Sequence, residues 1–277
     1  MTSLPEDLEF LERAVQQNPT DGEAWGRLGA AYRDADEDRL ALDAYRRATR
    51  FAPDSPPAWF GLASVLGDCD ETEGAVEAAR TAARLAPDKP AIQCLLGYQL
   101  LCAGRPREAL GALEEAVRLV PTWYVARGLL GRVQEQLGDH ELAVANLLES
   151  VRTTPDQPAL WTKLGVSLCE LRRFEEASRA LETATFHLPE SGEAWGRLGQ
   201  AYGQLGRHGD AVRAFEKAVE RGFGPSGLWL NLGQSAAELG DLRRLSRAYQ
   251  NLREDYPDEA GILQERLTAL HEERRER

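Results

Sequence analysis

The sequence predicts an all-α solenoid of stacked antiparallel helix pairs, and three periodic features predict it. Tryptophans recur at multiples of 34 residues, a leucine followed by a small residue recurs in the same register, and a proline recurs near the end of each period. The tryptophans in register are Trp25, Trp59, Trp161, Trp195 and Trp229. An interval kept this strictly indicates one structural unit repeated along the chain.

Seven repeats of 34 residues can be laid out without an insertion, and we number the places within a repeat from 1 to 34. They cover residues 22–55, 56–89, 90–123, 124–157, 158–191, 192–225 and 226–259. Leucine holds place 7 from Leu28 to Leu232, and glycine or alanine follows it at place 8 each time. Small residues let two helix backbones approach closely, so place 8 is predicted to be a helix-packing contact.

The second half of each repeat has its own pattern. Alanine holds place 20 in six repeats and place 27 in five, and proline holds place 32 in six. Proline lacks the N–H donor that a continuing helix needs, so it ends the second helix. Places 4, 7, 8 and 11 form one helical stripe and places 20, 24 and 27 form another, which predicts two helices per repeat.

This combination of residues resembles the tetratricopeptide-repeat (TPR) family. The first repeat matches with Trp25, Leu28, Gly29, Tyr32 and Ala41, and the sixth matches almost as completely. The resemblance implies a right-handed superhelical solenoid whose concave groove is formed mainly by the first helix of each repeat. It also implies binding of a protein or peptide rather than catalysis.

Both ends of the chain are predicted to cap the array. Residues 1–21 keep the register through Leu11, Ala14 and Pro19, so they resemble the second helix of a truncated leading repeat. Residues 260–277 are expected to form a C-terminal capping helix with a charged tail.

Several repeats depart from the pattern. The fourth has Arg127 at the tryptophan place and Ser150 at an alanine place, and the seventh has leucine at two small-residue places. The sixth ends in GFGPSG, with Phe223 at the proline place. Its glycines indicate either a longer turn or a flexible joint before the last repeat.

The charge and the composition of the chain argue against several classes of function. The formal charge of −12 opposes binding to nucleic acid and to anionic membranes. No segment resembles a secretion signal or a membrane span, and the four cysteines form no metal or disulfide pattern. We therefore expect a cytoplasmic protein, and the abundance of alanine, arginine and glycine favours a bacterial source.

Catalytic, metal and cofactor motifs are not found. The histidines share no helical face at ligand spacing, and His140 and His208 fall in turns, where we expect them to be solvated. The segment GRLG occurs twice but is assigned to helix packing, not to nucleotide binding. We expect no enzyme activity, no metal and no cofactor.

The predicted binding surface consists of places 2, 5, 9, 12 and 13, which lie beside the packing stripe. Trp123 joins it because it breaks the tryptophan register, and with Phe60, Tyr98 and Leu101 it would form an aromatic patch. These side chains could instead pack between repeats. The predicted contact residues are Phe60, Ser64, Cys94, Tyr98, Leu101, Trp123, Arg132, Glu135, Thr162, Val166, Gln200, Leu230 and Gln234.

The charges on this surface favour a partner with basic flanks. Arg33 and Arg132 oppose seven acids, namely Glu23, Asp34, Asp68, Glu135, Glu170, Glu193 and Glu238. The Lys and Asn pair with which chaperone-binding relatives clamp a terminal carboxylate is absent from places 5 and 9. Glycine at place 5 either leaves room for a ligand or relieves crowding.

Two functional hypotheses follow. The first is an interaction scaffold in a bacterial cytoplasmic assembly, which binds a peptide or amphipathic helix of a partner in its groove. The alternative is a self-associating structural protein, a homo-oligomer in which the terminal helices of one copy fill the groove of another.

Overall fold

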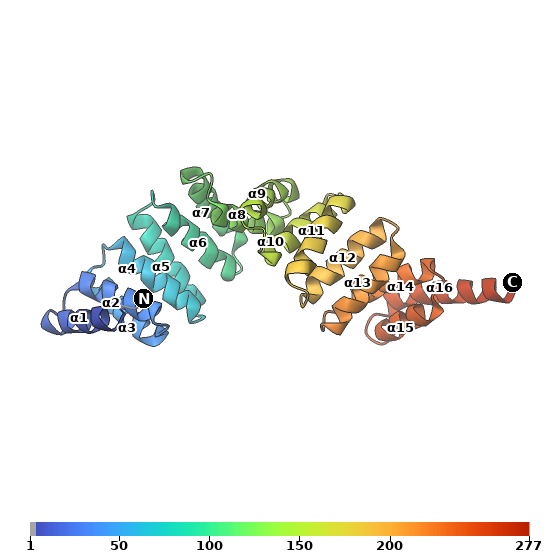
Figure 1. Cartoon of the computed structure of the whole chain (residues 1–277), viewed down its shortest axis with the longest axis horizontal. Coiled ribbons are helices and arrows are strands. Elements are labelled where there is room, and N and C mark those ends of the chain that lie inside the picture. Colours follow the sequence, from blue (N-terminus) through green and yellow to red (C-terminus); the bar gives the residue numbers. More distant parts are fainter. Residues whose placement is uncertain (1–3, 277) are drawn as a thin grey trace. The chain divides into compact units, whose positions relative to one another are not determined.

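The computed structural model describes residues 4–276, which are helical with short turns and contain no β-strand (Figure 1). The chain divides into two compact units, Met1–Leu137 and Gly138–Arg277. The division falls in the turn between the two helices of the fourth repeat. Each unit is a stack of antiparallel helix pairs, so the predicted fold class is confirmed for the described residues.

The N-terminal unit contains the first eight helices. They are α1 (Leu4–Gln17), α2 (Gly22–Asp34), α3 (Asp38–Phe51), α4 (Pro56–Asp68), α5 (Thr72–Leu85), α6 (Pro90–Cys102), α7 (Pro106–Leu119) and α8 (Tyr124–Leu137). The C-terminal unit contains α9 (His140–Thr153), α10 (Pro158–Glu170), α11 (Phe174–His187), α12 (Gly192–Gln204), α13 (His208–Glu220), α14 (Ser226–Glu238), α15 (Leu242–Leu252) and α16 (Pro257–Glu276).

The two helices of a repeat interlock at place 8, where a glycine faces the side chain at place 24. A Cβ at Gly97 would lie 2.4 Å from Leu113 Cγ, and one at Gly165 would lie 2.4 Å from Leu181 Cγ. Gly199 receives Phe215 in the same way. Real Cβ atoms do not approach this closely, so glycine at place 8 makes room for a large core side chain.

The turn between the helices of each repeat needs a left-handed residue at place 15. Glycine supplies it at Gly104, Gly138, Gly206 and Gly240, with φ between 66° and 85°. Asp36, Asp70 and Arg172 adopt the same conformation in the other three repeats. Glycine reaches this region without steric cost, which explains its preference at the turn.

Successive repeats are joined by a hydrogen bond from place 4 to the proline at place 32 of the preceding repeat. Trp59 Nε1 donates to the Pro53 carbonyl oxygen at 2.7 Å, and Trp25, Trp161 and Trp195 make the equivalent bond. Arg127 Nε donates to the Pro121 oxygen at 2.6 Å. The arginine that departs from the sequence pattern therefore makes the same contact as the tryptophan it replaces.

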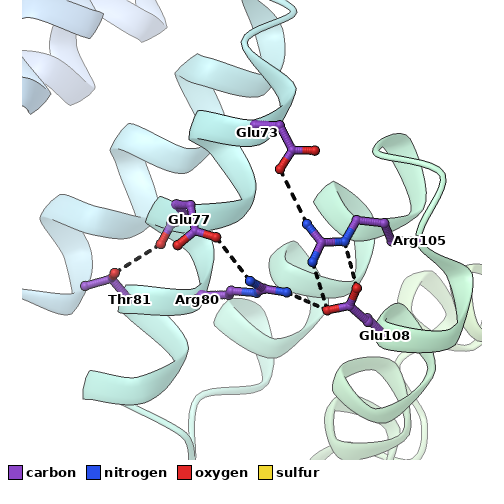
Figure 2. Close-up of polar contacts among 6 residues, drawn as sticks. All are labelled: Glu73, Glu77, Arg80, Thr81, Arg105 and Glu108. Carbon is purple, nitrogen blue, oxygen red and sulfur yellow. Dashed lines mark hydrogen bonds and ion pairs between the residues drawn. The ribbon is translucent and has the colours of Figure 1, made fainter.

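Ion pairs connect the second helices of neighbouring repeats. In Figure 2, Arg80 of α5 contacts Glu77 of its own helix and Glu108 of α7. Arg105, the residue before α7, binds Glu108 at 2.7 Å and reaches back to Glu73 at 3.4 Å. The guanidinium of Arg105 holds the pKa of Glu108 below its ordinary value. Ion pairs this close to the surface contribute little to the free energy of unfolding.

The turn after α13 is fixed by Phe223. Gly222 adopts φ 75°, and the Phe223 N–H donates to the Ala218 carbonyl oxygen, a left-handed helix end. The Phe223 side chain packs on the core of the last repeats. The contacts of Phe223 match the longer turn, the first of the two interpretations that the sequence left open.

At the C-terminal end α16 packs against α14 and α15. Its buried Leu263 lies over Gly233, beside the buried Leu245 and Leu252. The two leucines at small-residue places therefore belong to the core under this helix.

Candidate functional site

Two adjoining cavities lie between the first helices of the last two repeats, and together we call them the α12–α14 groove. The first cavity, of about 260 Å³, has polar and apolar lining in similar amounts, and we call it the apolar cavity after its Phe215, Phe223 and Leu228 side chains. Gly196, Arg197 and Gln200 of α12 and Gly227 and Asn231 of α14 also line it, and Pro225 completes it. Gln200, Phe215 and Asn231 also line the second cavity, so the two cavities adjoin.

The floor and end wall of the apolar cavity are aromatic. Phe215 comes from α13 and is almost fully buried, because it fills the space left by Gly199. Phe223 closes one end, and a Cβ at Gly196 would lie 2.8 Å from its ring. Glycine at place 5 of this repeat therefore relieves crowding against a framework aromatic.

The polar cavity, of about 330 Å³, continues from the shared residues toward α16. Side-chain amides of Gln200, Gln204, Asn231 and Gln234 line it. Glu238 and Arg266 stand at its far side, with their charged groups 4.0 Å apart. Each amide offers both a donor and an acceptor, which suits recognition of peptide groups.

His208, the first residue of α13, also lines the polar cavity. Its ring is half-buried, and its Nδ1 is shielded from solvent without a hydrogen-bond partner among the described residues. His140, the first residue of α9, is likewise half-buried with its Nδ1 shielded from solvent. The expectation that these two turn histidines are solvated is therefore wrong for the Nδ1 atom of both, because each ring packs at the start of its helix.

Arg197 is the one charged residue among the described lining of the apolar cavity. It is half-buried, and it makes a 3.4 Å contact with Gln200 Oε1. Its Nε is buried without a hydrogen-bond partner among the described residues, and no ion pair of the guanidinium with a described carboxylate is found. A partly desolvated cation without a counter-charge is costly, and an anionic ligand group would lower that cost.

The predicted contact residues of the C-terminal unit have different environments. Gln200 and Gln234 line the α12–α14 groove, whereas Leu230 is half-buried against the core of the last repeats. Thr162 and Val166 of α10 are buried. The pattern places them beside the packing stripe, but α10 also packs on the next first helix, α12, so these places provide little surface.

The predicted aromatic patch of the N-terminal unit is only partly exposed. Tyr98 is 43% exposed, and its contact with the Cys102 thiol raises the pKa of its hydroxyl. Phe60 is half-buried and packs against a cluster that includes Ala82 and Ile92. Trp123 is half-buried and packs against the core that α6, α7 and α8 form. Leu101 belongs to that core and is buried, as is Cys94, because first helices of adjacent repeats contact each other. Ser64 of α4 is half-buried, and so are Arg132 and Glu135 of α8.

Sequence reasoning missed Arg197 and Asn231, which both hold place 6, and it assigned Phe215 only to the packing stripe. The repeated GRLG could have indicated the site, since its arginine at place 6 lines a cavity in both copies. Phe223 was noted only as a missing proline.

Within residues 4–276, no group of His, Cys, Asp and Glu side chains is arranged to hold a metal ion. No described helix is both long and apolar enough to cross a membrane. The cysteines at 69, 94, 102 and 169 are unpaired in the structure.

Several solved structures share the fold. YrrB, a TPR protein with an unusual peptide-binding site, is 21% identical with a TM-score of 0.58; the match covers 66% of this chain and 95% of that one. A chain of the APC/C hetero-tetramer Cut9–Hcn1 is 18% identical with a TM-score of 0.65, covering 84% of this chain and 46% of that one. MamA from Desulfovibrio magneticus RS-1 is 20% identical with a TM-score of 0.55, covering 60% and 94%.

A comparison with curated protein sequences found no match. The tetratricopeptide-repeat family model matches residues 9–56, 94–158, 162–227 and 197–255. These matches span most of the chain and agree with the helix pairs and the 34-residue register described above. The chain belongs to the tetratricopeptide-repeat family.

Proposed function

We propose that the chain is a non-catalytic interaction scaffold that binds an extended segment of a partner protein in the α12–α14 groove. The groove combines an apolar cavity with a row of side-chain amides, and this combination is the observation that carries the proposal. One solved relative of the same fold is described as having a peptide-binding site.

An extended segment suits this groove better than a helix does. An extended backbone has N–H and C=O groups that are free to bind a partner, whereas those of a helix are already hydrogen-bonded to each other. The amides of Gln204 and Gln234 can donate to and accept from such groups, while the floor at Phe215 can hold an apolar side chain. Backbone contacts would then supply affinity, and the cavity would select the side chain.

A second contact region is proposed on the N-terminal unit, around Phe60, Tyr98 and Trp123. Tyr98 is exposed whereas Phe60 and Trp123 are half-buried, and Ser64, Arg132 and Glu135 would flank this region. We expect Tyr98→Ala combined with Trp123→Ala to reduce partner capture while circular dichroism stays native.

The proposal includes the charge of the partner and the cellular compartment. The acidic groove places and the net charge of −12 favour a partner with basic flanks. Unpaired cysteines and the composition favour a reducing bacterial cytoplasm. An assembly of several proteins is the natural context for such a scaffold.

Affinity purification with matched variants tests the groove. Partners are captured from the native organism with the wild type, with Gln200→Ala/Gln234→Ala, and with the control Gln250→Ala/Gln264→Ala. The control glutamines are exposed and line neither cavity. We expect the groove variant alone to lose the partners. Equal capture by both variants would reject this binding site.

A further inference from the structure

The same cavity is built twice in this chain, once in each unit. Residues 22–29 and 192–199 have the identical sequence GEAWGRLG. In the N-terminal unit a cavity of about 500 Å³ is lined by Gly26, Arg27 and Ala30 of α2 and by the buried Tyr45 of α3. Five repeats later the same places hold Gly196, Arg197, Gln200 and Phe215, which line the apolar cavity.

The two arginines differ although their local sequences are the same. Arg27 Nη2 pairs with Glu23 one turn earlier at 2.6 Å, and its side chain is 68% exposed. Arg197 does not pair with the equivalent Glu193 and instead reaches Gln200 on the following turn. Gln200 stands where the first copy has Ala30, so the second copy alone offers this polar contact.

The second copy is therefore a site with an unmatched charge. Its described lining holds one cation and no acid, whereas the lining of the first copy includes both Arg27 and Glu23. Apolar surface from Phe215, Phe223 and Leu228 lies beside the guanidinium. A ligand that fits both features has a large apolar side chain next to a carboxylate.

We propose that the apolar cavity recognises an internal Asp or Glu adjacent to a large apolar residue in an extended partner segment, with Arg197 as the carboxylate receptor. This deepens the proposed function and rests on it. We assign the carboxylate to a side chain because the apolar cavity adjoins the polar cavity at Gln200, Phe215 and Asn231, so an extended chain that contacts both would not end at Arg197. Basic flanks would lie beyond this point, near the acidic places of the groove.

A phage-displayed library of random 12-residue segments tests the assignment on the full chain. Display as an internal fusion leaves no free carboxyl terminus. The wild type and Arg27→Gln should enrich segments in which Asp or Glu lies next to a large apolar residue. Arg197→Gln should lose that preference, and Arg197→Lys should keep it with weaker binding, because lysine retains the charge without the planar fork.

Titration calorimetry with one enriched peptide measures the coupling free energy between the acid of the peptide and Arg197. Changing its acid to the matching amide should weaken binding to the wild type about tenfold or more and should change binding to Arg197→Gln little. Circular dichroism confirms that each variant is folded. If Arg197→Gln fails to fold, Arg197→Lys and the peptide substitution carry the test.

Three results would overturn the assignment: no enrichment of acids, no enriched segment at all, or an equal loss of preference in Arg27→Gln. The proposed function is judged separately, because the Gln200 and Gln234 capture experiment does not depend on an acid in the partner.

Discussion

The interlocking of Gly165 with Leu181 gives a prediction whose sign can be worked out from the structure. In Gly165→Ala the new Cβ would lie 2.4 Å from Leu181 Cγ and 2.8 Å from Cδ2, and Leu181 is fully buried. Overpacking of this kind costs about 1–3 kcal/mol, while replacing a helical glycine with alanine contributes up to about 1 kcal/mol. We expect a net loss of about 1 kcal/mol in the free energy of unfolding.

A matched control separates the two effects. Gly261 lies within α16 of the same unit, and a Cβ there meets nothing within 4 Å. Gly261→Ala should therefore stabilise the protein by about 0.5–1 kcal/mol. In a Leu181→Ala background the space is vacated, so Gly165→Ala should become neutral or stabilising, which is a coupling of about 1–3 kcal/mol.

Denaturant unfolding followed by circular dichroism measures these differences, and hydrogen exchange of α10 and α11 localises them to the C-terminal unit. The reasoning fails if Gly165→Ala is as stable as Gly261→Ala, or if Leu181→Ala does not change the sign of its effect.

The remaining predictions concern single contacts. Trp161→Phe removes the 2.7 Å bond to the Pro155 oxygen and should cost about 0.5–1.5 kcal/mol in urea unfolding; an unchanged midpoint would contradict the role given to this bond. Gly206→Ala should cost about 1 kcal/mol or more, because alanine is strained at φ 72°, and a neutral result would count against strain at this turn. Burial and the bond to Glu182 raise the pKa of Tyr202 to about 12, so its contribution to stability is present below pH 10 and is lost as the pH rises through 12. Absorbance titration should show this late ionisation and its shift to lower pH in Glu182→Gln.

The periodic features of the sequence were sufficient to predict the fold class. Glycine at place 8 and the large residue at place 24 are complementary in size, and both recur in register, so helix pairing was visible in the sequence. Proline at place 32 similarly indicated where second helices end. Such features are local and recur in most of the seven repeats, so they can be recognised from the sequence alone.

The contact surface was harder to predict because burial depends on neighbouring repeats. Cys94 and Val166 hold places beside the stripe, yet contacts between adjacent first helices bury them. Arg127 departs from the family pattern but makes the tryptophan's hydrogen bond. The difference between Arg27 and Arg197 lies in the residue one turn later and is invisible in their identical octapeptide.

Site-specific photo-crosslinking tests the central claim, that a partner segment lies in the α12–α14 groove. A benzophenone amino acid replaces Gly227 of α14 in one variant and Gln250 of α15 in the other, and both are irradiated with the captured partner. The first position lines the groove and the second is exposed outside it. Neither residue has a binding role in the proposal, and a side chain at position 227 meets nothing within 4 Å at its Cβ. We predict a crosslink at position 227 and none at position 250. A partner that is retained but crosslinks at 250 and not at 227 would contradict the account.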